Sequence, residues 1–315
     1  MKNGKKLLSA ALASVMVLAL AGCGSGDKKA EADTASDTKT EYDNSYCVDG
    51  KPSAKLTELR ESGTLTVGSS GDAPFAYIDQ DTNEFKGVDA EIIKEVGKRL
   101  GIKNVEMKLV PFSELILNMN SDNIDIICDC MYIREDRAKQ VYFGDIWYTQ
   151  GGGLLVADDG KISGEEDFDP DSTVIGYTPG TVWQTAVEKY ASDGKIKEAR
   201  ATGDQSESIV ALQNGKIDGF LTDSTVVENL FANSPDTVKG LKMAENYKDA
   251  PESIGRIAPS VSFENIGFMK EVNNVVKDLR DEGFIDQVFT DYKLDPTLHA
   301  ITNDEAKHDI NTREE

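Results

Sequence analysis

The chain has 315 residues and is strongly acidic, with 56 aspartate and glutamate residues against 34 lysine and arginine residues and a formal net charge of −22. Nucleic-acid binding and extended contact with anionic lipid headgroups both need a basic surface, so this balance argues strongly against both. The length allows one large domain or two medium domains.

The N-terminus has the features of an export signal. Three lysines precede an apolar run at residues 7–21, which is too short for a comfortable membrane span. The run ends in Leu-Ala-Gly-Cys at residues 20–23. This pattern resembles a bacterial lipoprotein signal, which implies that residues 1–22 are removed and that Cys23 is lipidated, anchoring the protein on the extracytoplasmic face of the cell membrane. The alternative is an ordinary secretory signal with a chance cysteine.

Residues 23–50 are predicted to form a flexible tether. From Gly24 to Asn44 the chain contains no valine, isoleucine, leucine or phenylalanine. Such a segment buries too little apolar surface to offset the entropy lost on ordering. As a coil of about 25 residues it would span roughly 25–30 Å, enough to hold a folded body near a bilayer.

The next segment alternates strand and helix patterns. Gly68 begins a turn-rich stretch after the first strand, and Gly101 ends a helix that Asp89 is predicted to cap. This βαβαβ order predicts a parallel sheet with helices on both faces. The predicted strands are 64–67, 105–110 and 124–128, and the predicted helices are 89–100 and 113–119.

The pattern then restarts, which predicts a second α/β unit. Gly151 to Gly153 is the expected crossing point between the units, and a later strand and helix follow the second unit. The chain after Pro296 is polar and is expected to be disordered. The predicted elements are strands 173–177, 217–221 and 254–257, and helices that begin at Thr181, Ser206, Ser224 and Phe268. The predicted division is lobe 1 at 51–148 and 251–295, lobe 2 at 149–250, and a tail at 296–315.

Cysteine use is sparse. With Cys23 assigned to lipid, Cys47, Cys128 and Cys130 remain, and a disulfide between the last two would be strained because they lie two apart in a predicted strand. Structural thiols are favoured, and a bridge from Cys47 stays open. The only histidines lie in the tail, so no metal site and no cofactor are predicted.

Several blocks of the chain match a known family in order and spacing. The strongest is residues 124–143, a strand, a turn and a helix carrying Arg137. The supporting blocks are residues 73–75 (APF), 87–91 (GVDAE), 110–112 (VPF), 176–181 (GYTPGT) and 215–224 (GKIDGFLTDS). From about Lys55 to Tyr292 the chain resembles the extracytoplasmic solute-binding proteins of ABC importers, in the polar amino-acid group.

The resemblance implies a fold and a function. The fold is α/β, with two Rossmann-like lobes joined by a two-strand hinge and a ligand cleft between them. The implied function is not enzymatic: a monomer captures an amino acid or a close analogue by hinge closure and delivers it to a membrane permease.

The resemblance also implies a clamp for a zwitterion. Arg137 would hold the α-carboxylate with its planar fork of donors, and Asp223 would hold the α-ammonium from the opposite lobe. The alternative for Arg137 is a surface arginine, and for Asp223 a helix-capping aspartate.

Other positions match the pocket wall of the family. The amides of Gly180 and Thr181 would accept an anionic oxygen at a helix N-terminus. Phe112 and Phe75 match pocket-lining aromatics, with hydrophobic core as the alternative. Asp72 replaces a usual aromatic residue, and a carboxylate there would favour a cationic or amide side chain on the ligand.

The chain departs from the family at positions that usually carry small or hydroxyl residues. Cys130 stands where glycine or serine is common, and Tyr132, Arg134 and Val182 replace serine or threonine. These changes replace side-chain contacts of the family pocket, so the resemblance implies an amino acid or close analogue and does not specify which one. Tyr132 would also fill space and favour a small or flat ligand.

Two other functions remain open at this point. The same fold hosts an extracytoplasmic dehydratase family, and a pair such as Asp129 with Asp223 is conceivable for acid–base catalysis. The predicted folded body has no histidine, because both histidines lie in the predicted tail, and this argues against Ser-His-Asp and Cys-His arrangements. The remaining alternative is a sensory protein that signals to a membrane partner.

Overall fold

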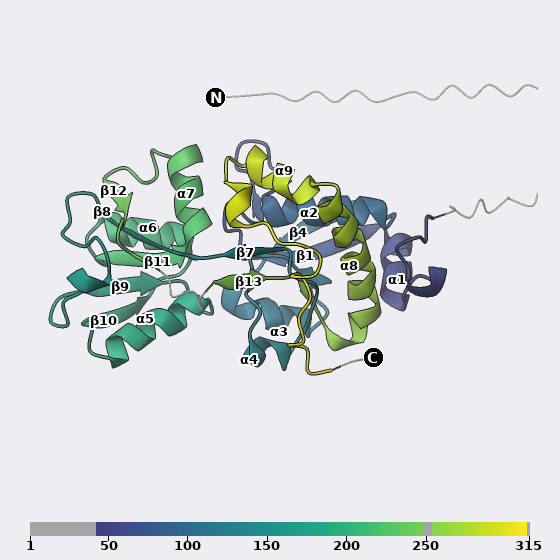
Figure 1. Ribbon diagram of the computed structural model, residues 1–315, viewed down its shortest axis with the longest axis horizontal. Coiled ribbons are helices and arrows are strands. Elements are labelled where there is room, and N and C mark those ends of the chain that lie inside the picture. Colours follow the sequence, from purple (N-terminus) through teal and green to yellow (C-terminus); the bar gives the residue numbers. More distant parts are fainter. Residues whose placement is uncertain (1–41, 249–253, 314–315) are drawn as a thin grey trace, which may run out of the picture. The chain divides into compact units, whose positions relative to one another are not determined.

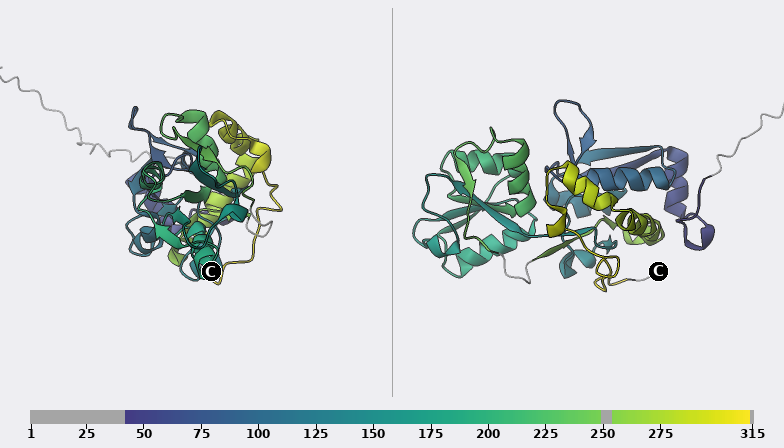
Figure 2. Two further views of the ribbon diagram at one scale, coloured as in Figure 1. Left: turned by 90° about the vertical axis from the view of Figure 1, so that its left-hand side faces the viewer. Right: turned by 45° about the horizontal axis from the view of Figure 1, so that its top comes forward.

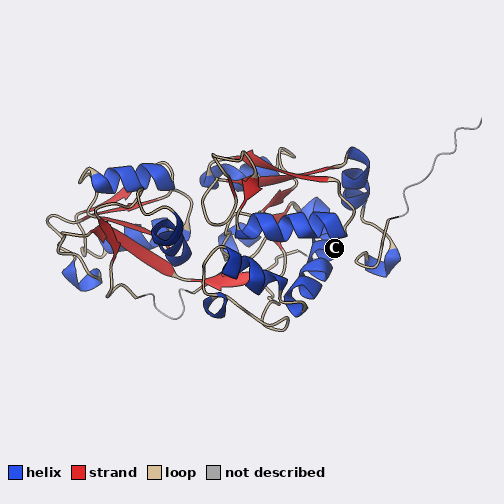
Figure 3. Ribbon diagram, turned by 90° about the horizontal axis from the view of Figure 1, so that it is seen from above, coloured by secondary structure: helices blue, strands red, loops and turns tan. Residues whose placement is uncertain are grey.

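The computed structural model describes residues 42–248 and 254–313. The predicted signal at residues 1–22 and the lipidation site at Cys23 lie outside the described residues. In the part of the chain that is described, no helix has the length and apolar character needed to cross a membrane. The described chain forms two five-stranded sheets with helices packed on them (Figure 1; Figure 3).

The first lobe is built on the sheet of order β4-β1-β5-β14-β6. Strand β1 runs parallel to β4 and β5, whereas β14 runs antiparallel to β5 and β6. A small hairpin of β2 and β3 projects from this lobe (Figure 2). The strands are β1 (Thr64–Ser69), β2 (Tyr77–Ile78), β3 (Phe85–Lys86), β4 (Asn104–Leu109), β5 (Ile126–Ile127), β6 (Tyr142–Phe143) and β14 (Ser260–Val261), and the helices are α1 (Ala54–Ser62), α2 (Val88–Arg99), α3 (Leu115–Met119), α4 (Glu135–Ala138), α8 (Ile266–Asp281) and α9 (Phe284–Asp291).

The second lobe is built on the sheet of order β10-β9-β11-β8-β12. Strand β9 runs parallel to β10 and β11, and β8 runs antiparallel to β11 and β12. Its strands are β8 (Gly152–Ala157), β9 (Val174–Tyr177), β10 (Glu198–Ala201), β11 (Gly219–Asp223) and β12 (Leu241–Met243), and its helices are α5 (Val182–Ser192), α6 (Gln205–Gln213) and α7 (Ser224–Asn233). Short 3-10 turns are η1 (Val48–Gly50), η2 (Phe112–Glu114), η3 (Glu165–Asp167), η5 (Phe263–Asn265) and η6 (Pro296–Leu298).

Two antiparallel strands connect the lobes: β7 (Tyr148–Gln150) leaves the first lobe and β13 (Gly255–Ile257) returns to it. We call this pair the hinge strands. The predicted α/β fold with two lobes is confirmed, but the sheets are mixed rather than parallel. The parallel strands end at the cleft, whereas β8 begins there, with Gly152 opposite Asp223, and so must run away from it.

Helix α2 shows how local sequence sets a boundary. Asp89 was expected to cap this helix, but Gly87 takes the N-cap position at φ 125°, where a Cβ would lie 2.1 Å from the carbonyl oxygen of Phe75. Asp89 lies in the first turn instead, and its buried carboxylate is free to bond elsewhere. Basic residues in the last turn complement the helix dipole.

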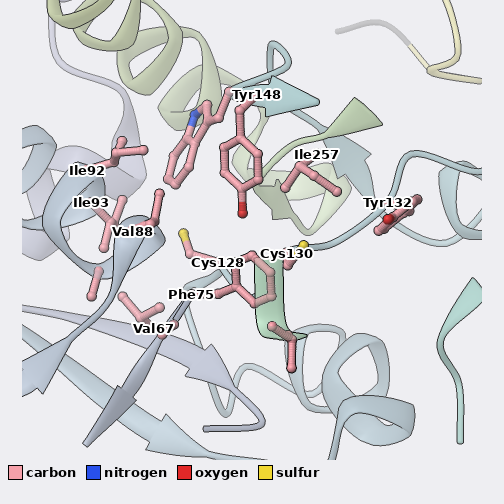
Figure 4. Close-up of a cluster of buried hydrophobic side chains, with 14 of the residues drawn as sticks. Val67, Phe75, Val88, Ile92, Ile93, Cys128, Cys130, Tyr132, Tyr148 and Ile257 are labelled. Carbon is pink, nitrogen blue, oxygen red and sulfur yellow. The ribbon is translucent and has the colours of Figure 1, made fainter. Parts of the chain in front are cut away.

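A buried cluster next to the hinge joins the core of the first lobe to the cleft (Figure 4). The hydroxyl of Tyr148 points between the sulfurs of Cys128 and Cys130, and the ring of Phe75 stacks on Tyr148 with centroids 6.5 Å apart. All three described cysteines, including Cys47, are buried and free of disulfides. They therefore act as small apolar core residues in this structure.

The folded body begins earlier than the predicted tether boundary at residue 50. Arg60 on α1 donates to Asn44 Oδ1 at 2.7 Å and to the carbonyl of Asp43 at 3.0 Å, and its guanidinium lies 4.5 Å from the ring centroid of Tyr42. Cys47 is buried in the core of the same lobe. Residues 42–50 are therefore part of the first lobe and not of a free tether.

The expectation that the chain after Pro296 is disordered is wrong for the described residues. His299 is 3% exposed, stacks on Phe289 at 4.5 Å and forms a hydrogen bond of 2.8 Å between Nδ1 and the carbonyl of Thr149. Further along, the carbonyl of Ala306 accepts from the amide of Ile146. The tail is polar, yet a few buried groups attach it beside hinge strand β7.

Candidate functional site

A pocket lined by both lobes lies at the carboxyl ends of β1 and β5 in the first lobe and of β9 and β11 in the second. Open α/β sheets bind ligands at such edges. The pocket is nearly closed: its free volume is about 20 Å³, which is room for about one water molecule. Its lining residues are Asp72, Phe75, Phe112, Asp129, Cys130, Tyr132, Arg137, Thr178, Thr181, Val182, Trp183, Gln205, Thr222, Asp223 and Val226.

Arg137 enters the pocket from α4 of the first lobe and is 6% exposed. Its guanidinium donates from Nη1 to the carbonyl of Tyr132 at 2.8 Å and from Nη2 to the carbonyl of Gly180, in the other lobe, at 2.7 Å. It also lies over the ring of Phe112, 5.4 Å from the centroid. Burial, followed by the charge of Arg134, lowers the pKa of Arg137 to about 10, so the side chain stays cationic at neutral pH.

Asp223 ends β11 and faces the pocket from the second lobe. It occupies the N-cap position of α7, but its side chain makes no capping hydrogen bond. Instead Oδ1 accepts from the Tyr132 hydroxyl at 2.8 Å and from Trp183 Nε1 at 3.1 Å. The carboxylate is therefore aimed across the cleft and not at its own helix, and Tyr132 joins the two lobes at this point.

In the loop before α5, the backbone amides of Gly180 and Thr181 already have hydrogen-bond partners within the second lobe. The Gly180 N–H donates to Gln184 Oε1 at 2.8 Å, and the Thr181 N–H donates to the carbonyl of Thr178 at 3.4 Å. The expectation that these two amides would be free for an anion is therefore wrong in this structure. Gly180 lies outside the pocket lining and contributes its carbonyl to Arg137 instead.

Aromatic side chains form the walls. Phe112 is half-buried beside Arg137, whereas Phe75 is 2% exposed and serves both the core and the pocket. Tyr132 meets Trp183 edge to face at 6.0 Å. With Val182, these two residues also line a neighbouring groove of about 650 Å³ on their other side. They therefore form the partition between the pocket and that groove.

Two further carboxylates lie at the other end of the pocket, Asp72 and Asp129. Ser70 Oγ lies 2.5 Å from Asp129 Oδ2 and 3.1 Å from Asp72 Oδ2, and so bridges the two side chains. Asp129 also accepts from Ser69 Oγ at 2.8 Å and from the Ser70 amide at 2.7 Å. Burial raises the pKa of both carboxyls, and for Asp72 the charge of Asp129 is the next cause.

Cys130 is held in an uncommon backbone conformation. Its φ is 47°, and its amide donates to Asp89 Oδ2 at 2.7 Å, while Asp89 Oδ1 accepts from the Tyr148 hydroxyl at 2.8 Å. Burial raises the pKa of the Cys130 thiol well above its usual range, so the thiol stays protonated and unreactive. Asp89 thus couples the pocket loop to the start of a hinge strand.

A family model described as bacterial extracellular solute-binding proteins, family 3, matches residues 65–295 of the chain. The chain belongs to this family. It is thus an extracytoplasmic solute-binding protein and not an enzyme, as the sequence predicted.

Named relatives of this solute-binding protein extend over most of its length. The L-cystine-binding protein TcyA of Bacillus subtilis (strain 168) is 26% identical over 285 residues, 90% of this chain and 96% of that protein. A glutamine-binding protein of Geobacillus stearothermophilus is 28% identical over 274 residues, 86% of this chain and 94% of that one. A solved structure of an ArgBP variant from T. maritima has a TM-score of 0.66 and 25% identity, and covers 76% of this chain and 98% of its own.

The sequence does not indicate several residues that line the pocket of the solute-binding protein: Thr178, Trp183, Gln205, Thr222 and Val226. For Asp129 the sequence suggests only a place in a catalytic pair with Asp223, whereas the structure puts it in the pocket wall. Trp183 could have been found from its place in the first turn of the helix that begins after Thr181. Gln205 carries no local signal, because only the return of the chain through β10 brings it to the pocket.

Asp89 makes the stability of the solute-binding protein depend on pH. Burial raises the pKa of this carboxyl from 3.8 to about 6. Because the folded protein binds the proton more tightly than the unfolded chain does, stability falls as the pH rises from about 4 to about 6, by up to about 3 kcal/mol. Asp89→Asn should remove this contribution, so its stability relative to the parent protein should rise between pH 4 and pH 7.

Urea unfolding of both proteins at the two pH values measures this difference. A difference in unfolding free energy that is the same at pH 4 and pH 7 would show that burial does not raise the pKa of Asp89.

Proposed function

We propose that this protein captures an amino acid or a close analogue between its lobes and delivers it to the membrane permease of an ABC importer. The observation that carries the proposal is the pairing of opposite charges in one pocket, with Arg137 from the first lobe and Asp223 from the second. The names of its relatives, which bind cystine and glutamine, support the same class of ligand.

In the proposed complex Arg137 binds the ligand α-carboxylate, and Asp223 binds the α-ammonium. A guanidinium holds a carboxylate with two parallel hydrogen bonds, which fixes the orientation of the ligand. The ligand groups would replace contacts that now join the lobes, the Tyr132 hydroxyl on Asp223 and the Gly180 carbonyl on Arg137. The ligand would thus take over the contacts that hold the cleft closed.

Access of the ligand to the pocket requires motion, because the pocket holds about one water and an amino acid is several times larger. The hinge strands β7 and β13 are the two connections that bend. Separation of Tyr132 from Asp223 and Trp183 would open the partition between the pocket and the neighbouring groove. The ligand then favours the closed form, which the permease recognises.

We propose that the protein is located on the extracytoplasmic face of the membrane, as a monomer that is anchored by lipid on Cys23. The family is described as extracellular, and the lipoprotein-like sequence at 20–23 supports the anchor. No cofactor is needed for this function. Mass spectrometry of the mature N-terminus tests the anchor: an acylated Cys23 supports it, and an unmodified N-terminus contradicts it.

A thermal-shift screen with the protein amino acids tests the proposed function. A ligand that binds the folded state alone raises the melting temperature, and at 100 times its Kd it adds about 2.7 kcal/mol of stability. We expect at least one amino acid or simple derivative to raise the melting temperature by several degrees. A folded protein that no amino acid stabilises at millimolar concentration would contradict the proposal.

A further inference from the structure

The charged groups that line the pocket are unbalanced. One cation, Arg137, faces three carboxylates, those of Asp72, Asp129 and Asp223. This inference rests on the proposed function, in which Arg137 and Asp223 bind the two charged groups that every α-amino acid carries. Asp72 and Asp129 then remain without a cation in the described pocket, and buried charge is costly unless it is paired.

The two remaining carboxylates are held in place by the chain that follows β1. The Ser70 hydroxyl lies 2.5 Å from Asp129 Oδ2 and 3.1 Å from Asp72 Oδ2, and Asp129 receives two further hydrogen bonds, from the Ser69 hydroxyl and the Ser70 amide. Asp129 is 2% exposed, and Asp72 is half-buried at the pocket wall. These bonds hold Asp129 in place, whereas Asp72 has only the shared Ser70 hydroxyl within hydrogen-bond distance among the described residues.

The second lobe adds a neutral acceptor to the same pocket. Gln205 lies at the start of α6, and its Oε1 is buried without a hydrogen-bond partner among the described residues. A buried acceptor without a donor costs free energy until a donor arrives. The acceptor oxygens of Asp72, Asp129 and Gln205 are therefore complementary to a ligand group that has several hydrogen-bond donors and no acceptor.

We propose that the ligand side chain ends in a hydrogen-bond-donating cation, a guanidinium or an alkylammonium, which binds between Asp72, Asp129 and Gln205. Such a group neutralises the carboxylate pair and offers donors to the glutamine oxygen. A neutral amide offers fewer donors and brings an acceptor of its own. The raised pKa of the Asp72 and Asp129 carboxyls is in keeping with a pair that lacks a cation.

Comparing arginine with citrulline measures the effect of ligand charge at nearly constant shape, because arginine ends in a guanidinium and citrulline in a neutral urea group of nearly the same size. Calorimetric titration of the full protein with L-arginine, L-lysine, L-citrulline and L-glutamine is the test. We expect L-arginine or L-lysine to bind most tightly. If it is arginine, citrulline should be at least about 30-fold weaker, as expected for loss of one partner of a buried charge pair.

Asp72→Asn should then lower the affinity for the preferred cation more than tenfold and reduce the arginine-to-citrulline ratio. Asp236→Asn is the matched control, because Asp236 is an exposed residue of the second lobe that follows α7 and lies outside the pocket lining. Its effect on affinity should stay within about threefold, since exposed charges interact weakly.

Three outcomes overturn the inference. Glutamine or citrulline could bind as tightly as the cations, or Asp72→Asn could leave the arginine-to-citrulline ratio unchanged; in both cases the proposed amino-acid binding stands. Absence of binding by every amino acid would overturn the proposed function as well.

Discussion

Replacing Arg137 with alanine is expected to weaken amino-acid binding by about 30-fold to several-thousand-fold, because it strands a buried ligand carboxylate at a cost of about 2–5 kcal/mol. Arg137 is the one cation among the residues that line the described pocket. The fold should persist, although the carbonyls of Tyr132 and Gly180 each lose a donor. Calorimetry of the variant with the ligand found by the thermal-shift screen measures the loss.

Arg200→Ala provides the control for removing one arginine. This side chain lies on β10 at the surface, where it pairs with Glu198, and it lines no part of the pocket. Its removal should leave affinity unchanged. Arg137→Lys should retain part of the affinity, since it keeps the charge but loses the planar fork. An unchanged affinity in Arg137→Ala would show that the ligand carboxylate binds elsewhere.

Replacing Gly180 with alanine is expected to reduce affinity more than tenfold by opposing closure of the lobes. Gly180 has φ 84°, and a Cβ there would lie 2.8 Å from the Cα of Ser113, which belongs to the other lobe. That neighbour is backbone and cannot rotate away. Closure would therefore have to stop short, and Arg137 would lose its bond to the Gly180 carbonyl.

Gly215→Ala is the matched control for Gly180→Ala. Gly215 also has a positive φ, of 63°, but a Cβ at this position would have no described atom within 4 Å, so alanine there has the same kind of backbone strain without touching the other lobe. Such strain costs roughly 1–2 kcal/mol of stability. Both variants should lose stability, and only Gly180→Ala should lose affinity. Equal affinities would show that this contact does not limit closure.

The main elements of both lobes could be predicted because their periodicity is strong. Helix α8 repeats buried apolar residues along one face, and β9 and β11 are short apolar runs between turns. Strand β14 could not be predicted, because two residues, Ser260 and Val261, carry no pattern. Its direction depends on hinge strand β13, which precedes it, and its antiparallel pairing with β5 makes the first-lobe sheet mixed.

The polar tail was misjudged because its order comes from partners far away in the chain. Composition alone argues for disorder after Pro296. His299 nevertheless finds an aromatic partner in Phe289 and a backbone partner in Thr149. Isolated buried groups of this kind leave no periodic signal in their own segment.

The pocket could be predicted in part. The motif around Arg137 and the strand end at Asp223 place both residues at the cleft, and the structure brings both into one lining. The bonding of Tyr132 was not foreseen, because it depends on how the two lobes meet. Its hydroxyl reaches Asp223 across the cleft, whereas the sequence predicted that Tyr132 would fill space and favour a small or flat ligand.

The structure of the protein with its ligand tests the central claim most directly. We expect an amino acid between the lobes, with its carboxylate oxygens about 2.7–2.9 Å from the Arg137 guanidinium and its ammonium within hydrogen-bond distance of Asp223. A ligand bound outside this pocket, or one inside it whose charged groups contact neither Arg137 nor Asp223, would contradict the proposed clamp.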